Sequence, residues 1–418
     1  MSHGRCGPVR DGGSSSADQG PTVGQRIQSC RRKRGMSREV LAGLVGKSTR
    51  WVKAVERGEI QQPKLPMLLT LAEALKVRDI AELTGGREIS VTMFRGPGHP
   101  ALPAVRDAIN AIAVPMGDGP PPLGHLQVRL DAAWRARHAA PDHRTVLGAL
   151  LPDLIRDARR AVRAYEGADR RRALALLAGV YNLAQFFLAY QPASDLLWRV
   201  AERGIMAAEE SEDPSAFAGA VWLAVQAHRD VNDYDAAEAI NHQALETLEP
   251  HVETATTELR ALWGALHYEA AYTAACAGQR GTAWSWWERA DEIARRLPGG
   301  HYEPMTSFSQ VIMGAHAVTV AVEARQGGEA HRQATRFAGA AIPSQPRKGR
   351  HLIEVARAWQ LSGDAPAALG ALNDAYAAAP ETIRYNGFAK RMTLELAGGP
   401  SNLRRAARDL ADRIGVLV

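Results

Sequence analysis

The chain has 418 residues, of which 46% are hydrophobic, and a formal net charge of +6. This length is sufficient for two or three domains with cores of their own, and the composition indicates a globular protein. The three cysteines are isolated, which excludes a disulfide framework or a cysteine zinc site and favours a reducing cytoplasm, and no apolar run is long enough for a transmembrane helix.

The positive charge is concentrated at the start of the chain. Residues 1–90 carry 16 Lys and Arg against 9 Asp and Glu, whereas the remaining residues carry 35 against 36. A basic segment of this kind is typical of nucleic-acid binding, because Lys and Arg neutralise the phosphate backbone. Within this segment, residues 1–20 are rich in Gly and Ser, and we expect them to form a disordered tail.

Residues 37–58 predict two short helices joined by a tight turn. Ser37 and Ser48 are suited to cap the two helices, and Gly46 lies between them where the chain must turn sharply. The second helix would expose polar and net positive side chains: Thr49, Arg50, Lys53 and Arg57. This pattern favours a helix-turn-helix whose second helix enters the major groove of DNA.

Flanking segments extend this motif to a five-helix domain over residues 21–86. Residues 22–34 have apolar side chains at helical spacing and end in a basic run. After residue 58, Pro66 is suited to the first turn of a further helix, and a short helical segment over residues 79–83 follows.

Residues 22–85 resemble the phage repressor-like (Cro/XRE-type) DNA-binding domain. The resemblance is carried by Gly35, Ser37, Glu39, Leu41-Ala42, Gly46, Ser48, Val52, Val55-Glu56-Arg57-Gly58, Pro63, Leu68, Leu71-Ala72, Ala74-Leu75 and Leu83. It implies that base edges are read by Thr49, Arg50 and Lys53, and that Arg31 and Glu56 form a structural ion pair. It also implies that the DNA phosphates are held by Arg38, which stands where the family often has Gln, and by Ser48, Trp51 and Arg57.

The second part of the chain begins with a change in composition. Residues 87–125 are rich in Pro and Gly and predict a semi-rigid linker, with one short helix over residues 104–112. From residue 126 to residue 418 the pattern is helical nearly throughout, without the alternation that is typical of strands.

The predicted helices of this last segment form pairs. These pairs are Arg172–Tyr190 with Ala193–Glu209, Ser215–Arg229 with Asp235–Leu248, Glu258–Ala277 with Thr282–Arg296, Met305–Arg325 with Glu329–Ala340, and Gly349–Leu361 with Ala365–Ala378. Their turns recur every 36 to 49 residues, which is typical of an α-solenoid. The segment resembles degenerate tetratricopeptide (TPR) repeats. We therefore expect an all-α fold, with a five-helix repressor-like DNA-binding domain followed by a TPR-like α-solenoid over residues 126–418.

The whole chain is similar to the long XRE-type regulators of actinomycetes, through the phrases WVKAVERG, HPALPAVRDAI and HLIEVARAW. In such solenoids the first helix of each pair lines the concave face. Polar or aromatic residues predicted on that face form a candidate effector groove: Tyr181, Asn182, Gln185, Gln226, Tyr268, Tyr272, Gln310 and Arg357. Asn and Gln amides at such positions can hold a peptide backbone.

No phosphate-binding loop, nucleophile elbow, dinucleotide-binding pattern or metal-ligand pair is present in the sequence, so we expect neither an enzyme nor a cofactor or metal. The sequence predicts a sequence-specific transcriptional regulator that binds double-stranded DNA. We expect a homodimer on a palindromic operator, a peptide, protein or small-molecule effector, and no membrane partner. The alternative is a TPR-type adaptor that binds proteins, in which the N-terminal helical domain does not read DNA.

Overall fold

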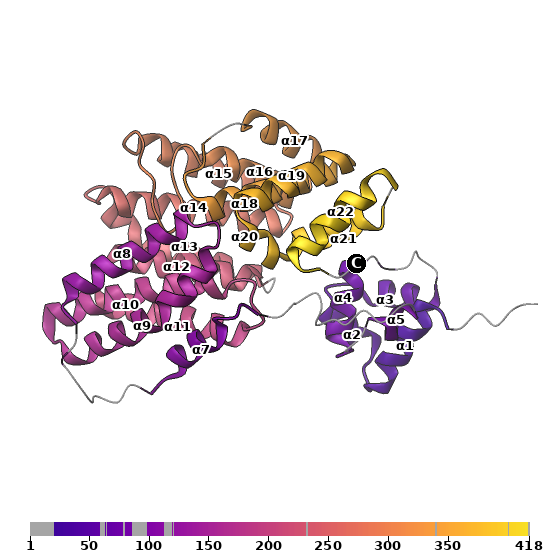
Figure 1. The fold of residues 1–418 in the computed structure, drawn as a ribbon, viewed down its shortest axis with the longest axis horizontal. Coiled ribbons are helices and arrows are strands. Elements are labelled where there is room, and N and C mark those ends of the chain that lie inside the picture. The colour runs from indigo at the N-terminus through magenta and orange to yellow at the C-terminus, as the bar shows by residue number, and fades with distance from the viewer. Residues whose placement is uncertain are drawn as a thin grey trace, which may run out of the picture. The chain divides into compact units, whose positions relative to one another are not determined.

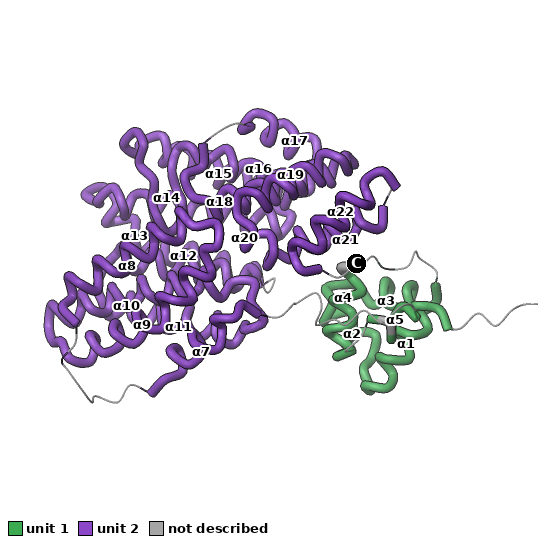
Figure 2. Tube along the Cα trace, viewed as in Figure 1, with its two compact units in different colours: residues 1–94 green, residues 95–418 purple. Residues whose placement is uncertain are grey.

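The computed structural model describes residues 21–58, 63, 65–77, 80–85, 98–112, 119, 121–230, 233–338, 341–399 and 401–416. Every regular element within these ranges is a helix, which confirms the predicted all-α fold class. The chain divides into two compact units, residues 1–94 and residues 95–418, which we call unit 1 and unit 2 (Figure 2). None of the described helices is both long and apolar enough to cross a lipid bilayer.

Unit 1 places short helices around one small core (Figure 1). Its described helices are α1 (Val23–Lys33), α2 (Arg38–Leu44), α3 (Thr49–Arg57), α4 (Leu65–Ala74) and α5 (Ala81–Thr84). Apolar side chains at helical spacing supply the buried core, which includes Ile27, Leu41, Val52, Leu71 and Leu75. The predicted five-helix arrangement is therefore confirmed.

Local capping fixes the two helices of the predicted helix-turn-helix. The Ser37 side chain accepts a hydrogen bond from the backbone N–H of Val40 at 3.2 Å, and Ser48 accepts one from Trp51 at 3.2 Å. Gly46, between the helices, has a φ of 62°, in the left-handed region that favours glycine. The turn and both caps are thus encoded by single residues.

Unit 2 consists of helices that pack mainly against their neighbours in the sequence. Its described helices are α7 (Leu102–Asn110), α8 (Leu123–Ala139), α9 (His143–Ala164), α10 (Gly167–Leu188), α11 (Ser194–Ser211), α12 (Pro214–Asp230), α13 (Tyr234–Val252), α14 (Thr257–Cys276), α15 (Arg280–Arg296), α16 (Met313–Glu323), α17 (Gly327–Arg336), α18 (Gln345–Leu361), α19 (Ala365–Ala378), α20 (Pro380–Tyr385), α21 (Gly387–Ala397) and α22 (Ser401–Ile414). The five predicted pairs correspond to α10 with α11 through α18 with α19, and the members of each pair pack together. Two further pairs, α8 with α9 and α21 with α22, extend the array.

The predicted helix Met305–Arg325 is wrong at its start, because α16 begins at Met313. The Glu303 carboxylate accepts hydrogen bonds from the backbone N–H of Met305 at 2.9 Å and of Thr306 at 2.6 Å. Ser307 then has a φ of 63°, which is incompatible with a right-handed helix. A side chain therefore stabilises a turn where the apolar pattern indicates a helix.

The predicted linker over residues 87–125 contains a packed helix. In α7, Val105 and Ile109 are buried in the same core cluster as Leu147 and Leu151 of α9. His99, just before α7, is also buried, and its backbone N–H donates to Gln191 Oε1 at 2.7 Å. The residues from His99 to α7 therefore belong to unit 2, because their apolar side chains are needed to cover α9.

Unit 2 curls so that α8 and α9, near its start, contact α18 and α20. α8 packs against α18, and His138 of α8 donates through Nε2 to the carbonyl of Pro304 at 2.7 Å. Its Nδ1 lies 2.8 Å from Ser344 Oγ, just before α18. In addition, Glu381 of α20 accepts the backbone N–H of Arg144 in α9 at 2.5 Å. The array is therefore closed on itself, and a cavity lies inside it.

Candidate DNA-binding surface and central cavity

Helix α3 of unit 1 buries an apolar face and exposes a cationic one. Val52 and Val55 are buried in the core, whereas the opposite face carries side chains predicted to contact DNA. Of these, Ser48, Arg50, Lys53 and Arg57 are exposed, and Thr49 and Trp51 are half-buried. Arg and Lys on the leading turns of such a helix can donate to base edges and phosphates. Trp51 also packs against the core of unit 1, so part of its ring has a structural role.

Glu56, at the far end of α3, joins three helices. Its side chain is fully buried, and Oε1 accepts from Nε of Arg31 in α1 at 2.5 Å. Its Oε2 accepts from Nε of Arg38 in α2 at 2.7 Å. Burial on its own would raise the pKa of Glu56, but the hydrogen bonds and charges of the two arginines hold this pKa below its usual value.

Arg38 therefore has a partner within the protein, although the sequence favours it as a phosphate contact. Its side chain is 30% exposed, so part of it remains accessible while Nε binds Glu56. The position combines a structural contact with access to solvent.

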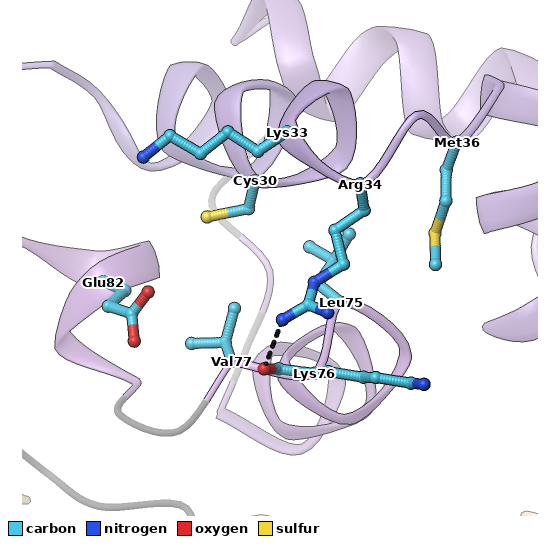
Figure 3. A pocket seen from close by; sticks show the side chains of 8 residues that line it. All are labelled: Cys30, Lys33, Arg34, Met36, Leu75, Lys76, Val77 and Glu82. Atoms are coloured by element: carbon cyan, nitrogen blue, oxygen red, sulfur yellow. Dashed lines mark hydrogen bonds between the residues drawn. The ribbon is translucent and has the colours of Figure 1, made fainter.

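A hollow lies on unit 1 between α1 and the segment after α4 (Figure 3). It is lined by Cys30, Lys33, Arg34, Met36, Leu75, Lys76, Val77 and Glu82, and Arg34 Nη2 donates across it to the carbonyl of Lys76 at 2.9 Å. Burial raises the pKa of the Cys30 thiol, which favours its protonated form. No residue of α3 lines this hollow, so it is separate from the cationic face.

The central cavity of unit 2 has a volume of about 200 Å³. Of the predicted effector-groove residues, Gln226, Tyr268 and Tyr272 line it. Sequence reasoning missed the arginines that line the same cavity: Arg137, Arg144, Arg229, Arg347 and Arg350.

The other predicted groove residues lie elsewhere. Tyr181 is buried in the hydrophobic core, and Gln185 donates to the carbonyl of Leu223 at 2.7 Å, which connects α10 to α12. Asn182 lines a different hollow, where its Nδ2 lies 3.4 Å from Met305 Sδ. Gln310 is exposed in the turn before α16. These four residues therefore do not contribute to the central cavity.

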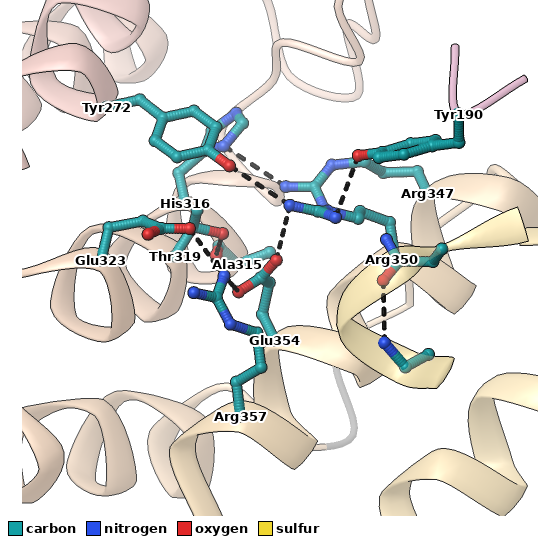
Figure 4. A network of polar contacts seen from close by, with 12 residues as sticks. Tyr190, Tyr272, Ala315, His316, Thr319, Glu323, Arg347, Arg350, Glu354 and Arg357 are labelled. Carbon is teal, nitrogen blue, oxygen red and sulfur yellow. Dashed lines mark hydrogen bonds and ion pairs between the residues drawn. The ribbon is translucent and has the colours of Figure 1, made fainter. Parts of the chain in front are cut away.

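Arg357 belongs to a polar network beside the cavity (Figure 4). Its Nη1 lies 2.6 Å from Glu323 Oε1 and 2.8 Å from Glu354 Oε2. Glu354 also pairs with Arg350 at 2.7 Å, and Arg350 donates to the hydroxyl groups of Tyr190 and Tyr272 at 3.1 and 3.2 Å. This network connects α16 and α18 with the turn after α10 and fixes one wall of the cavity.

Residues 22–84 match the family model of a helix-turn-helix domain. The N-terminal segment is a helix-turn-helix domain. Among curated proteins, none matches the chain.

Three solved structures are similar to the chain at low identity. The Rap protein complexed with competence and sporulation factor shares 13% identity over 71% of this chain and 88% of that chain, with a TM-score of 0.43. PlcR of Bacillus thuringiensis, in complex with the peptide PapR7 and DNA, shares 13% identity over 66% and 95% of the two chains, with a TM-score of 0.29. ComR of S. thermophilus, in complex with DNA and its signalling peptide ComS, shares 13% identity over 85% of this chain and 99% of that chain, with a TM-score of 0.29.

Proposed function

We propose that this protein is a transcriptional regulator of the Cro/XRE class, of the type found in actinomycetes, and that it acts on double-stranded DNA in the cytoplasm. The observation that carries the proposal is the helix-turn-helix domain, together with the exposed cationic face of α3. The positive charge of residues 1–90 adds a favourable, sequence-independent attraction to the phosphate backbone.

In this proposal, α3 lies in the major groove. Arg50 and Lys53, with Thr49, contact base edges, because a guanidinium group can donate two hydrogen bonds to guanine O6 and N7. Phosphate contacts come from the edges of the helix-turn-helix: Arg38, Ser48, Trp51 and Arg57. These contacts fix the register of α3 on the duplex but carry no sequence information.

One helix-turn-helix domain buries too little surface for specificity at the level of single genes. We therefore propose a homodimer that binds two half-sites of a palindromic operator, about one helical turn apart, with unit 2 supplying the dimer contact. Unit 2 would also bind an effector. An effector changes DNA affinity only if it binds more tightly to one arrangement of the dimer than to the other.

Selection of bound fragments from a random DNA library tests the proposal. The full-length protein should enrich one palindromic sequence, and Arg50→Ala should enrich it more weakly, with relaxed preference at one base pair of each half-site, because it removes one base contact. Arg32→Ala is the matched control, since Arg32 is exposed on α1, outside α3. A protein-binding adaptor would enrich no sequence, and that result would overturn the assignment as a regulator.

A further inference from the structure

The central cavity of unit 2 contains more positive charge than its carboxylates balance. Of the five described arginines that line it, Arg229 pairs with Glu269 and Arg350 pairs with Glu354. The other three are Arg137, Arg144 and Arg347. Among the residues that the structure describes, no carboxylate lies within ion-pair distance of their guanidinium groups.

The contacts of these three guanidinium groups leave their charge unbalanced. Arg137 lies over the ring of Phe186, 4.0 Å from its centroid, and Arg144 Nη1 donates to the carbonyls of Phe186 and Phe187, both at 2.7 Å. Arg347 Nη2 lies 3.3 Å from His316 Nδ1. Burial lowers the pKa of Arg137 and of Arg144 to about 10, so both side chains remain charged at neutral pH.

The cavity lining also contains buried donors without a hydrogen-bond partner. These are Nε of Arg137, Nε of Arg144, Nε1 of Trp222 and Nδ2 of Asn386. The orientation of the Asn386 side-chain amide is defined, because its Oδ1 accepts a hydrogen bond from the backbone N–H of Ala389 at 3.0 Å. Nδ2 is therefore the atom that lacks a partner. Buried donors in native proteins nearly always have an acceptor, so the wall of this cavity is rich in donors as well as in positive charge.

Size and wall chemistry restrict what that acceptor can be. The cavity, at about 200 Å³, is smaller than the roughly 300–1,000 Å³ that drug-sized ligands occupy, and a peptide of several residues is larger still. Its walls include Phe186, Trp222, Tyr268 and Tyr272, whose rings offer flat apolar surfaces. Asp230, a lining carboxyl with no ion pair among the described residues, interacts with the charges of Arg229 and Arg350 rather than with those of the three unbalanced arginines.

We propose that this cavity binds a small organic anion, a carboxylate or phosphate with a flat apolar part, whose charge is held by Arg137, Arg144 and Arg347. Such a ligand would balance the excess charge by accepting charge-assisted hydrogen bonds from the guanidinium groups. The inference rests on the proposed function only for the role of the anion as an effector, because binding itself requires no DNA.

Thermal unfolding and calorimetric titration of the full-length protein test the binding. The probes are benzoate, phenylacetate and phenyl phosphate at constant ionic strength, with 2-phenylethanol as the uncharged control. At least one anion should bind and raise the Tm by a few degrees, whereas 2-phenylethanol should not. The anion that raises the Tm most shows whether the site prefers a carboxylate or a phosphate group. If every anion shifts the Tm no more than chloride does, the proposal is wrong.

Variants locate the site. Arg137→Met keeps a long side chain against Phe186 but removes a buried charge, so the Tm without ligand should stay equal or rise, while affinity for the anion should fall at least tenfold. Arg347→Met, at a half-buried position, should also lose affinity, and Arg347→Lys should restore part of it. Arg156→Met is the matched control, since Arg156 is half-exposed on α9 and pairs with Asp153 outside the cavity.

The outcomes separate this inference from the proposed function. If the best-binding anion keeps its affinity in both Met variants, the cavity is not the site and the inference fails, whatever the DNA selection shows. If the protein binds the anion with the expected variant pattern but enriches no DNA sequence, the inference holds and the assignment as a regulator fails.

Discussion

Nε of Arg38 lies 2.7 Å from Oε2 of Glu56, while Oε1 of the same carboxylate accepts a hydrogen bond from Nε of Arg31 at 2.5 Å. One buried carboxylate thus connects α1, α2 and α3, and it sits one turn after the residues proposed to read DNA. The orientation of α3 relative to α1 and α2 is therefore held by this side chain in addition to the apolar contacts of Val52 and Val55.

We expect Glu56→Gln to destabilise unit 1 by about 3 kcal/mol, because two arginines would lose their shared carboxylate in a buried setting. Hydrogen exchange of the backbone amides of α1, α2 and α3 in the full-length protein measures the effect. Glu39→Gln, at an exposed position in the first turn of α2, is the control and should leave exchange nearly unchanged. Equal protection in the two variants would show that the Glu56 contacts contribute little.

The same carboxylate predicts how unit 1 responds to acid. The folded-state pKa of Glu56 is lowered from the ordinary value of 4.5, so its contribution to stability is complete above that value and is lost as the pH falls through the folded-state pKa. Amide protection in α1, α2 and α3, corrected for intrinsic exchange rates, should therefore decrease below about pH 4.5. Glu56→Gln should show a weaker dependence in this range, and an identical pH profile would contradict the prediction.

Close contact between α1 and α3 predicts that Gly24 cannot be enlarged. A Cβ atom added at Gly24 would overlap the carbonyl oxygen of Val55, which is backbone and cannot move aside. We expect Gly24→Ala to cost about 2 kcal/mol or more of unit 1 stability, as overpacking does. Gly43→Ala in α2 is the control, because no atom lies within 4 Å of an added Cβ there, and it should stabilise by about 0.5–1 kcal/mol. The stabilities of the two variants are compared by urea unfolding of the full-length proteins, with hydrogen exchange of the α1 amides as the readout.

Arg50→Ala should weaken binding to the selected operator by about 1–3 kcal/mol and relax specificity at one base pair, because it removes one base contact. Fluorescence anisotropy with operator and scrambled DNA measures both effects. The wild-type affinity should also fall steeply as salt increases, since phosphate contacts release counterions. An operator affinity that is equal in wild type and Arg50→Ala would exclude α3 as the reading helix in the proposed register.

Much of the fold could be predicted from the sequence because the signals are local. Ser37, Ser48 and Gly46 each determine a cap or a turn within four residues of themselves, and the apolar spacing of each helix is read directly from the chain. The start of α16 could not be predicted in this way. There, Glu303 and a positive φ at Ser307 override an apolar pattern that continues without interruption.

The central cavity was only partly predictable. Gln226, Tyr268 and Tyr272 were found by assuming that first helices line the concave face, and this holds for them. On α18, however, Arg347, Arg350, Glu354 and Arg357 recur at helical spacing on one side, a charged stripe that the sequence already contains. Arg137 and Arg144 reach the same cavity from α8 and α9 only because the array closes, and that closure depends on contacts between residues more than 160 positions apart.

The contact between α8 and α18, together with the bond from Arg144 to Glu381, also determines how unit 2 should come apart. In an open repeat array each repeat touches only its neighbours, so the ends can fray while the middle persists. Here α8 and α9 pack against α18 and α20, so the loss of either pair of helices exposes the surface of the other pair. Unit 2 should therefore unfold in one sharp, all-or-none thermal transition. Truncation of the chain after α17 should also destabilise α8 and α9, although they lie at the opposite end of the unit 2 sequence.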